Sequence, residues 1–190
     1  RVPLIGFAGA PFTLLCYMVE GKGSKGFEKA KSFCFAQPQL AKSLLDKITE
    51  STIAYLIGQI KAGADVVQVF DSWSGLLGPD DFDEFAAPYL LRIAEAVAPH
   101  APVILFPKGS NYALSSLSAN KAVSGIGLDW TIRPAEAREA TQHRVALQGN
   151  FDPSKLILPP ALIKKEVRAM IEAFGVKGYI ANLGHGIMPH

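Results

Sequence analysis

Several features that mark particular classes of protein are scarce in this sequence of 190 residues. Its two cysteines, Cys16 and Cys34, cannot build a disulfide framework and lack CxxC spacing. No apolar run approaches the ~18–20 residues of a membrane-spanning helix. Lysines and arginines are scattered, and the formal net charge is only +2, so no nucleic-acid partner is indicated. We expect a reducing, cytoplasmic setting without membrane contact.

Signs of a multi-domain chain are also missing. No internal repeat, low-complexity tract or linker interrupts the sequence, so we expect a single domain over residues 1–190. Hydrophobic residues make up 49% and charged residues 19%, which is typical of a folded globular chain rather than a disordered one. The chain has no initiator Met or signal-like segment, and it stops soon after an apolar run. We therefore expect it to be a fragment of a longer chain.

Short runs rich in Val, Ile, Leu and Phe recur along the chain. None alternates strictly between apolar and polar residues, so we expect strands buried on both faces, as in a parallel sheet. The predicted strands span residues 2–7, 65–70, 102–106, 125–128, 144–147 and 178–182. Helical patterns fill the gaps between them. The predicted helices begin at Pro11, span 38–62, 79–98 and, more weakly, 111–119, begin again at Pro134, and span 160–174 before Gly175.

Six strand-then-helix units predict a parallel sheet, either doubly wound or a (β/α)8 TIM barrel. The GxGxxG motif that follows the first strand of many nucleotide-binding sheets is absent. Polar or glycine-rich segments instead follow every strand, as in barrels whose sites are built from the strand-to-helix loops. We therefore favour a (β/α)8 barrel with about six of its eight units in this chain, and expect the other two before Arg1.

Residues 6–21, GFAGAPFTLLCYMVEG, combine a short strand, a turn of small residues and a helix that opens at Pro11. Proline is favoured at the first helical position. Free N–H groups at such a helix start can hold an anion, although an ordinary strand-to-helix turn has the same pattern. Tyr17 lies on the same helix.

The segments GFAGAPFTLLCYMVEG, LDW, QGNFDP and NLGHGIMP, in this order and spacing, resemble the uroporphyrinogen decarboxylase family over the whole chain. The resemblance implies the C-terminal two-thirds of a (β/α)8 barrel, without the N-terminal part and the extreme C-terminus. It also implies a carboxy-lyase of haem biosynthesis, which converts the four acetate side chains of uroporphyrinogen III to methyl groups without metal or organic cofactor. A cytoplasmic homodimer is expected, with uroporphyrinogen as the small-molecule partner.

The resemblance assigns substrate binding to Tyr17, Ser72 and His185. Hydroxyl and imidazole groups can donate hydrogen bonds to the carboxylates of a tetrapyrrole. The family's catalytic aspartate and its carboxylate-binding arginines match no segment here, so we expect them before Arg1. We interpret Asp71, Asp129 and Asp152 as structural, and Trp73 and Trp130 as core residues. A polypeptide of these residues alone is expected to be inactive.

Two alternatives stay open at this point. Corrinoid-dependent methyltransferases resemble this family and bind zinc through His and Cys at strand ends, but residues 106–109 and 183–186 contain no cysteine. An inactive barrel that binds a tetrapyrrole or a partner protein would also keep Tyr17, Ser72 and His185. Metal analysis and the residues upstream of Arg1 would distinguish these readings.

Overall fold

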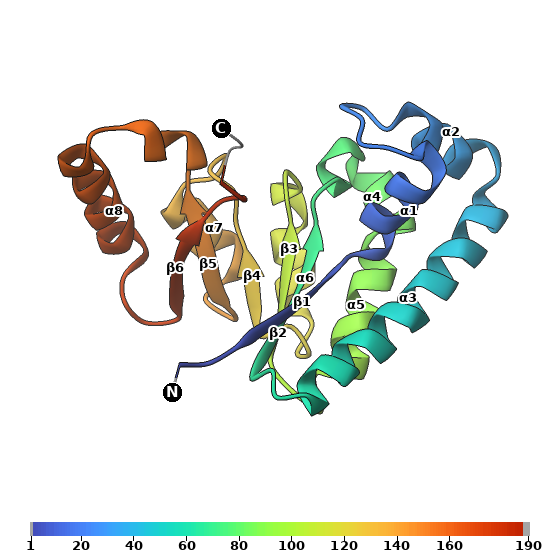
Figure 1. The fold of residues 1–190 in the computed structure, drawn as a ribbon, viewed down its shortest axis with the longest axis horizontal. Helices are drawn as coiled ribbons and strands as arrows, with labels where there is room; N and C mark the ends of the chain where they lie inside the picture. Colours follow the sequence, from blue (N-terminus) through green and yellow to red (C-terminus); the bar gives the residue numbers. More distant parts are fainter. Residues whose placement is uncertain (1, 188–190) are drawn as a thin grey trace.

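The computed structural model describes residues 2–187, which form one sheet of six parallel strands (Figure 1). Each strand pairs with the next one along the chain. In the first pair of strands Ile5 lies opposite Val66, and in the last pair Leu147 lies opposite Tyr179. The strands are β1 Ile5–Gly9, β2 Val66–Asp71, β3 Val103–Pro107, β4 Gly125–Gly127, β5 Ala146–Phe151 and β6 Tyr179–Leu183. The order and direction confirm the predicted part of a (β/α)8 barrel.

Helices connect all neighbouring strands. They are α1 Pro11–Glu20, α2 Glu28–Ala36, α3 Pro38–Lys61, α4 Pro79–Phe85, α5 Ala87–Val97, α6 Leu114–Ala119, α7 Pro134–Thr141 and α8 Pro160–Phe174. Short 3-10 turns η1 Ser74–Leu76, η2 Asn111–Ala113 and η3 Pro153–Ile157 follow β2, β3 and β5. Proline stands at the first position of α1, α3, α4, α7 and α8, where its missing N–H costs no helical hydrogen bond.

The helices pack against the outer face of the sheet. α3 contacts β1 and β2, α5 contacts β3, α6 contacts β4, and α8 contacts β5. Figure 1 shows α1 to α5 beyond one end of the row of strands and α8 beyond the other. The core between helices and sheet contains fully buried side chains such as Phe12, Leu90 and Leu105. Burial of each such side chain contributes roughly 1.5–3 kcal/mol.

Two helix predictions need correction. The helix expected over residues 79–98 is divided into α4 and α5 at Ala86, whose φ of −126° is not helical. Pro88 explains the break, because its ring would clash with the carbonyl of Glu84 in a continuous helix. The second correction is α2, which pattern reasoning missed because the segment has little apolar periodicity.

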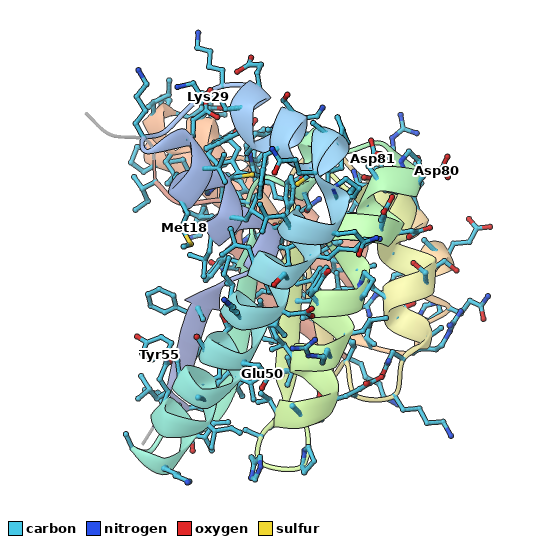
Figure 2. The ribbon with its side chains drawn as sticks, turned by 90° about the vertical axis from the view of Figure 1, so that its right-hand side faces the viewer. Met18, Lys29, Glu50, Tyr55, Asp80 and Asp81 are labelled. Carbon is cyan, nitrogen blue, oxygen red and sulfur yellow. The ribbon has the colours of Figure 1, made fainter. Side chains whose placement is uncertain are left out.

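The prediction that all strands are buried on both faces is wrong for β1 and β6. β3 is fully buried, whereas Phe7 of β1 is 63% exposed and Ile180 of β6 is 39% exposed. These two strands are the edges of the observed sheet, because each pairs on one side only. Beside β1, an apolar groove of about 660 Å³ includes Met18 and Tyr55, which project together on this side of the molecule (Figure 2).

No helix within residues 2–187 combines the length and the hydropathy that crossing a bilayer would require.

Candidate active site

The carboxyl ends of all six strands lie at the same end of the sheet, because the strands are parallel. In barrel enzymes this end carries the chemistry. Here it contains η1 after β2, the segment 108–111 after β3, the segment 128–133 after β4, and residues 184–187 after β6.

A buried polar link joins α1 to the end of β2. The Thr13 hydroxyl donates to Asp71 Oδ1 at 2.7 Å, and the backbone N–H of Trp73 donates to Thr13 Oγ1 at 3.2 Å. Asp71 is fully buried, and this burial raises its pKa to about 6, against the opposing effect of hydrogen bonds from Thr13 and Ser74. The carboxyl group of Asp71 therefore contacts the first turn of α1 through the side chain of Thr13. The link also fixes Ser72 relative to the helix that bears Tyr17.

The loops after β2 and β3 are locked together by their backbones. Lys108 N donates to Asp71 O at 3.1 Å, and Gly75 N donates to Lys108 O at 3.1 Å. The Ser110 hydroxyl donates to that of Ser74, also at 3.1 Å. The close approach requires glycine at position 75, because a Cβ there would lie 2.6 Å from Lys108 O.

We expect Gly75→Ala to destabilise the chain by about 1–3 kcal/mol, because the added methyl group must displace backbone rather than a flexible side chain. The free energy of unfolding, obtained from urea denaturation of both proteins, measures the effect. Gly58→Ala is the matched control: it lies inside α3, nothing stands within 4 Å of its added Cβ, and it should stabilise the chain by roughly 0.5–1 kcal/mol. Equal effects of both substitutions would contradict the described contact between the two loops.

Asp129 organises the loop after β4. Its Oδ2 accepts from Gly109 N at 2.6 Å, and its Oδ1 accepts from the backbone N–H and the hydroxyl of Thr131. The Asn150 amide of β5 donates to the carbonyls of Asp129 and Ile132, at 3.0 and 2.8 Å. Both carboxylate oxygens of Asp129 are thus engaged, in agreement with its structural interpretation.

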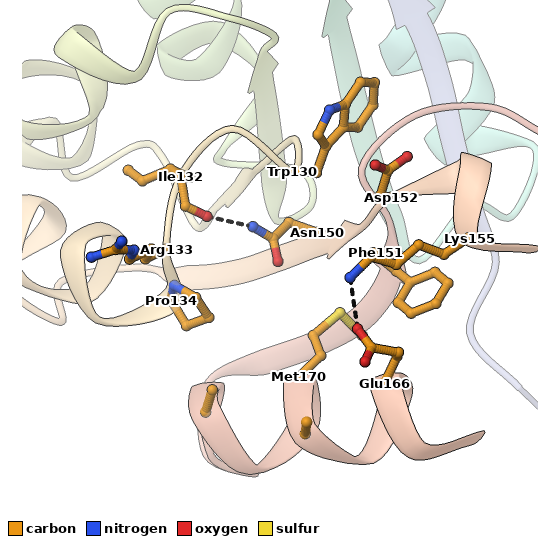
Figure 3. A pocket seen from close by; sticks show the side chains of 12 residues that line it. Trp130, Ile132, Arg133, Pro134, Asn150, Phe151, Asp152, Lys155, Glu166 and Met170 are labelled. Atoms are coloured by element: carbon orange, nitrogen blue, oxygen red, sulfur yellow. Dashed lines mark hydrogen bonds and ion pairs between the residues drawn. The ribbon is translucent and has the colours of Figure 1, made fainter. Parts of the chain in front are cut away.

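A shallow cavity of about 340 Å³ opens between the loop after β4 and α8 (Figure 3). Asn150 reaches the Ile132 carbonyl on one side, and Lys155 pairs with Glu166 of α8 at 2.6 Å on the other. Asp152 caps η3 through a hydrogen bond from Ser154 N, as its structural interpretation predicted.

His185 follows β6 by two residues. The preceding Gly184 donates to Phe151 O at 2.7 Å and packs on the loop after β4, where a Cβ would stand 3.0 Å from Asp129 Cα. Gly186 N donates to His185 Nδ1 at 2.7 Å, so the proton of the neutral imidazole lies on Nε2. Partial burial and the Lys108 ammonium lower the pKa of His185, while Asp129 acts in the opposite direction.

His185 borders a cavity of about 400 Å³ inside the curve of the sheet, together with Phe70 and Phe106. At its base Gln148 of β5 donates to Gln68 Oε1 of β2 at 3.0 Å, which joins two strands that are not neighbours. The site thus has an apolar wall, a buried amide pair and a hydrogen-bond donor at the rim.

Tyr17 and Ser72 lie on the other side of this end of the sheet. Tyr17 is 42% exposed and meets the rings of Phe27 and Trp73 edge-on, at 5.5 and 6.2 Å between centroids. Ser72 is half-buried next to Trp73. Tyr17 borders the groove beside β1, whereas His185 borders the inner cavity. Tyr17 therefore contacts Trp73, the neighbour of Ser72 in the sequence, and binding of a common substrate by Tyr17, Ser72 and His185 stays a prediction.

Lys108 is a candidate site residue that sequence reasoning missed. Its Nζ lies 5.9 Å from the centroid of the Trp73 ring and 6.0 Å from that of Trp130. The interpretation of Trp130 as a core residue is wrong, because its side chain is 42% exposed. The available signal was the position of Lys108, directly after β3, which pairs with the strand that Ser72 follows.

Within residues 2–187, no group of three or more His, Cys, Asp or Glu side chains is arranged to hold a metal ion. Cys16 and Cys34 are buried in α1 and α2. Burial raises the pKa of the Cys16 thiol well above its usual range and that of the Cys34 thiol to about 11. In the absence of a metal ion both thiols therefore stay protonated at neutral pH.

Comparison with known proteins gives a consistent result over the whole chain. The family model of uroporphyrinogen decarboxylase (URO-D) matches residues 1–190. Uroporphyrinogen decarboxylases from Flavobacterium johnsoniae and Schizosaccharomyces pombe are 52% and 48% identical to all of this chain, which covers 55% of each. The protein from Danio rerio is 48% identical, with 53% of it covered. The chain thus spans about half the length of the curated relatives it matches.

A solved methyltransferase from Methanosarcina mazei has the same fold, with a TM-score of 0.83 over 98% of this chain and 53% of its own, at 26% identity. The family model matches every residue of this chain, and the identity to the relatives is about 50%; together these two findings establish the family. This chain belongs to the uroporphyrinogen decarboxylase family.

Proposed function

We propose that this chain is part of a carboxy-lyase that decarboxylates the four acetate side chains of uroporphyrinogen III to give coproporphyrinogen III. Family membership supports this activity, since the relatives are named for it. The observation that carries the proposal is His185 at the rim of the inner cavity, with its Nε2 proton available to an anion. A substrate with eight carboxylates needs such donors.

Tyr17, Ser72 and His185 are the proposed substrate-binding residues. Each can donate a hydrogen bond to a carboxylate of the tetrapyrrole, and bonds of this kind to an ionised acceptor are stronger than neutral ones. The link between Thr13 and Asp71 supports the role of Ser72, because it restricts the loop that bears this residue. A restricted donor loses less entropy on binding than a free one.

The proposed chemistry begins with protonation of a pyrrole ring at carbon. The protonated ring accepts the electron pair of the carbon–carbon bond as carbon dioxide leaves the acetate. The resulting exocyclic methylene then gains a proton and becomes a methyl group, with loss of the ring proton. Each complete decarboxylation of one acetate side chain consumes one proton overall and requires no oxidant. A carboxylate facing the pyrrole N–H groups would stabilise the cation, and we expect this aspartate before Arg1.

The remaining properties of the protein follow the family resemblance. We propose a cytoplasmic enzyme that works as a homodimer without metal or organic cofactor, and in which residues 1–190 form a single domain. Sedimentation of the complete gene product tests the dimer.

The fold neighbour from Methanosarcina mazei is a methyltransferase, so a zinc-dependent corrinoid methyltransferase is the second candidate. A zinc thiolate site needs cysteine at the strand ends, whereas Cys16 and Cys34 are buried in helices on the outer side of the sheet. Elemental analysis of the purified protein distinguishes the two functions. Stoichiometric zinc would favour the methyltransferase.

The direct test is an anaerobic assay of the complete gene product with uroporphyrinogen III. After oxidation, chromatography separates porphyrins by their number of carboxylates. We expect conversion through intermediates to the four-carboxylate product. An unchanged substrate, with folded protein and a relative as positive control, would reject the proposal.

A further inference from the structure

We propose that Lys108 is a carboxylate-binding residue of this site, and that it holds one substrate carboxylate together with His185. This inference deepens the proposed function and rests on it. It concerns a residue that neither the sequence motifs nor the pairing of strands had singled out.

The position of Lys108 is fixed by its own backbone and by that of its neighbour. Its N–H donates to Asp71 O, and its carbonyl accepts from Gly75 N, both at 3.1 Å. Gly109 N donates to Asp129 Oδ2 at 2.6 Å. The ammonium therefore extends from a segment that is tied to the loops after β2 and β4. A donor on such a segment is oriented before the ligand arrives.

The ammonium lies near two aromatic rings and has no carboxylate partner in the described part of the chain. Its Nζ is 5.9 and 6.0 Å from the ring centroids of Trp73 and Trp130, near the outer limit of cation–π attraction. The ion pairs within residues 2–187 involve other lysines and arginines. Asp129, on the adjacent loop, uses both oxygens for other hydrogen bonds. The positive charge is therefore available to an external anion.

His185 lies close enough to Lys108 for the two groups to interact. Gly184, next to His185, stands against Trp130, whose ring in turn faces Lys108. The Lys108 charge disfavours the protonated imidazole, and Asp129 favours it. Two donors that repel each other when charged are both stabilised by an anion between them. Carboxylate is the anion that the proposed substrate supplies.

The test uses the complete gene product and uroporphyrin III, the stable oxidised form of the substrate, as the probe. Binding is measured by fluorescence quenching at two sodium chloride concentrations. We expect Lys108→Met to raise Kd about tenfold at low salt, because a hydrogen bond to a charged group is lost. Lys108→Arg should stay within about twofold of the unmodified protein, because it keeps the charge. Lys121→Met, at an exposed lysine between α6 and β4, is the matched control and should change nothing.

Nuclear magnetic resonance of the His185 ring supplies a readout that does not depend on catalysis. We expect its pKa to rise in Lys108→Met without ligand, and to rise in the unmodified protein when uroporphyrin binds. Folding of each variant is checked by its urea midpoint. If Lys108→Met fails to fold, an increase in Kd caused by Lys108→Gln supports the proposal and an unchanged Kd rejects it.

The failures of the two proposals are distinguishable. An enzyme that produces coproporphyrinogen, with Kd and KM unchanged in folded Lys108→Met, rejects the role of Lys108 and keeps the proposed function. A protein that binds uroporphyrin through Lys108 but forms no coproporphyrinogen rejects the proposed function and keeps the binding residue. Absence of any porphyrin binding rejects both.

Discussion

Replacing His185 by leucine is expected to lower kcat/KM for uroporphyrinogen decarboxylation by about 10- to 100-fold. The imidazole Nε2–H is lost, and a hydrogen bond to a charged group contributes roughly 1.5–3 kcal/mol. The residue is exposed at the rim of the inner cavity, so the substitution leaves the core intact. The measurement is the initial rate of the complete gene product at several substrate concentrations under anaerobic conditions.

Two further variants show whether the donor itself matters. His185→Gln places an amide N–H near the position of Nε2 and should restore part of the lost kcat/KM. His100→Gln, at the end of α5, should leave the rate unchanged. An unchanged kcat/KM in His185→Leu would show that His185 does not bind the substrate.

A polypeptide of only these 190 residues is expected to form no measurable coproporphyrinogen, although the complete gene product should form it readily. The sheet has two exposed edges, β1 and β6, and the groove beside β1 leaves Met18 and Tyr55 uncovered. We expect the family's catalytic aspartate before Arg1, because no segment here resembles the motif that carries it. On this proposal the chain contains the proposed substrate-binding residues but not the group expected to stabilise the protonated pyrrole.

The two polypeptides are compared at equal concentration, with circular dichroism to verify that the shorter one is folded. Uroporphyrin binding is measured on the same samples. Coproporphyrinogen formation by the folded 190-residue polypeptide, above the rate without protein, would contradict this prediction and place the driving group within the chain.

Much of the architecture was predictable because it depends on local signals. Apolar runs without alternation marked the parallel strands, and prolines marked helix starts, as at Pro11 and Pro160. Local signals also explain two of the errors. Pro88 is a helix breaker, but the apolar periodicity on both sides of it led to the prediction of one continuous helix. α2 has too little apolar periodicity to be recognised as a helix. The exposure of β1 and β6 depends on which strands lie beside them, and a run of apolar residues carries no such information.

The candidate site was predictable only in part. The positions of Tyr17, Ser72 and His185 came from motifs, and their binding roles stay predictions. The hydrogen bond between Thr13 and Asp71 joins residues 58 positions apart, so no local pattern reveals it. Trp130 has a large apolar side chain of the kind usually found in a core, but it is partly exposed and lies beside Lys108. The contribution of a charged residue to a site depends on which loops the fold brings together.

The most direct test of decarboxylation without a metal measures carbon dioxide and product together. The complete gene product is treated with a chelator, verified as zinc-free by elemental analysis, and supplied anaerobically with uroporphyrinogen III. The proposed reaction predicts four molecules of carbon dioxide for each coproporphyrinogen formed, at the rate of the untreated protein. Loss of activity that zinc restores, or folded protein that releases no carbon dioxide, would contradict it.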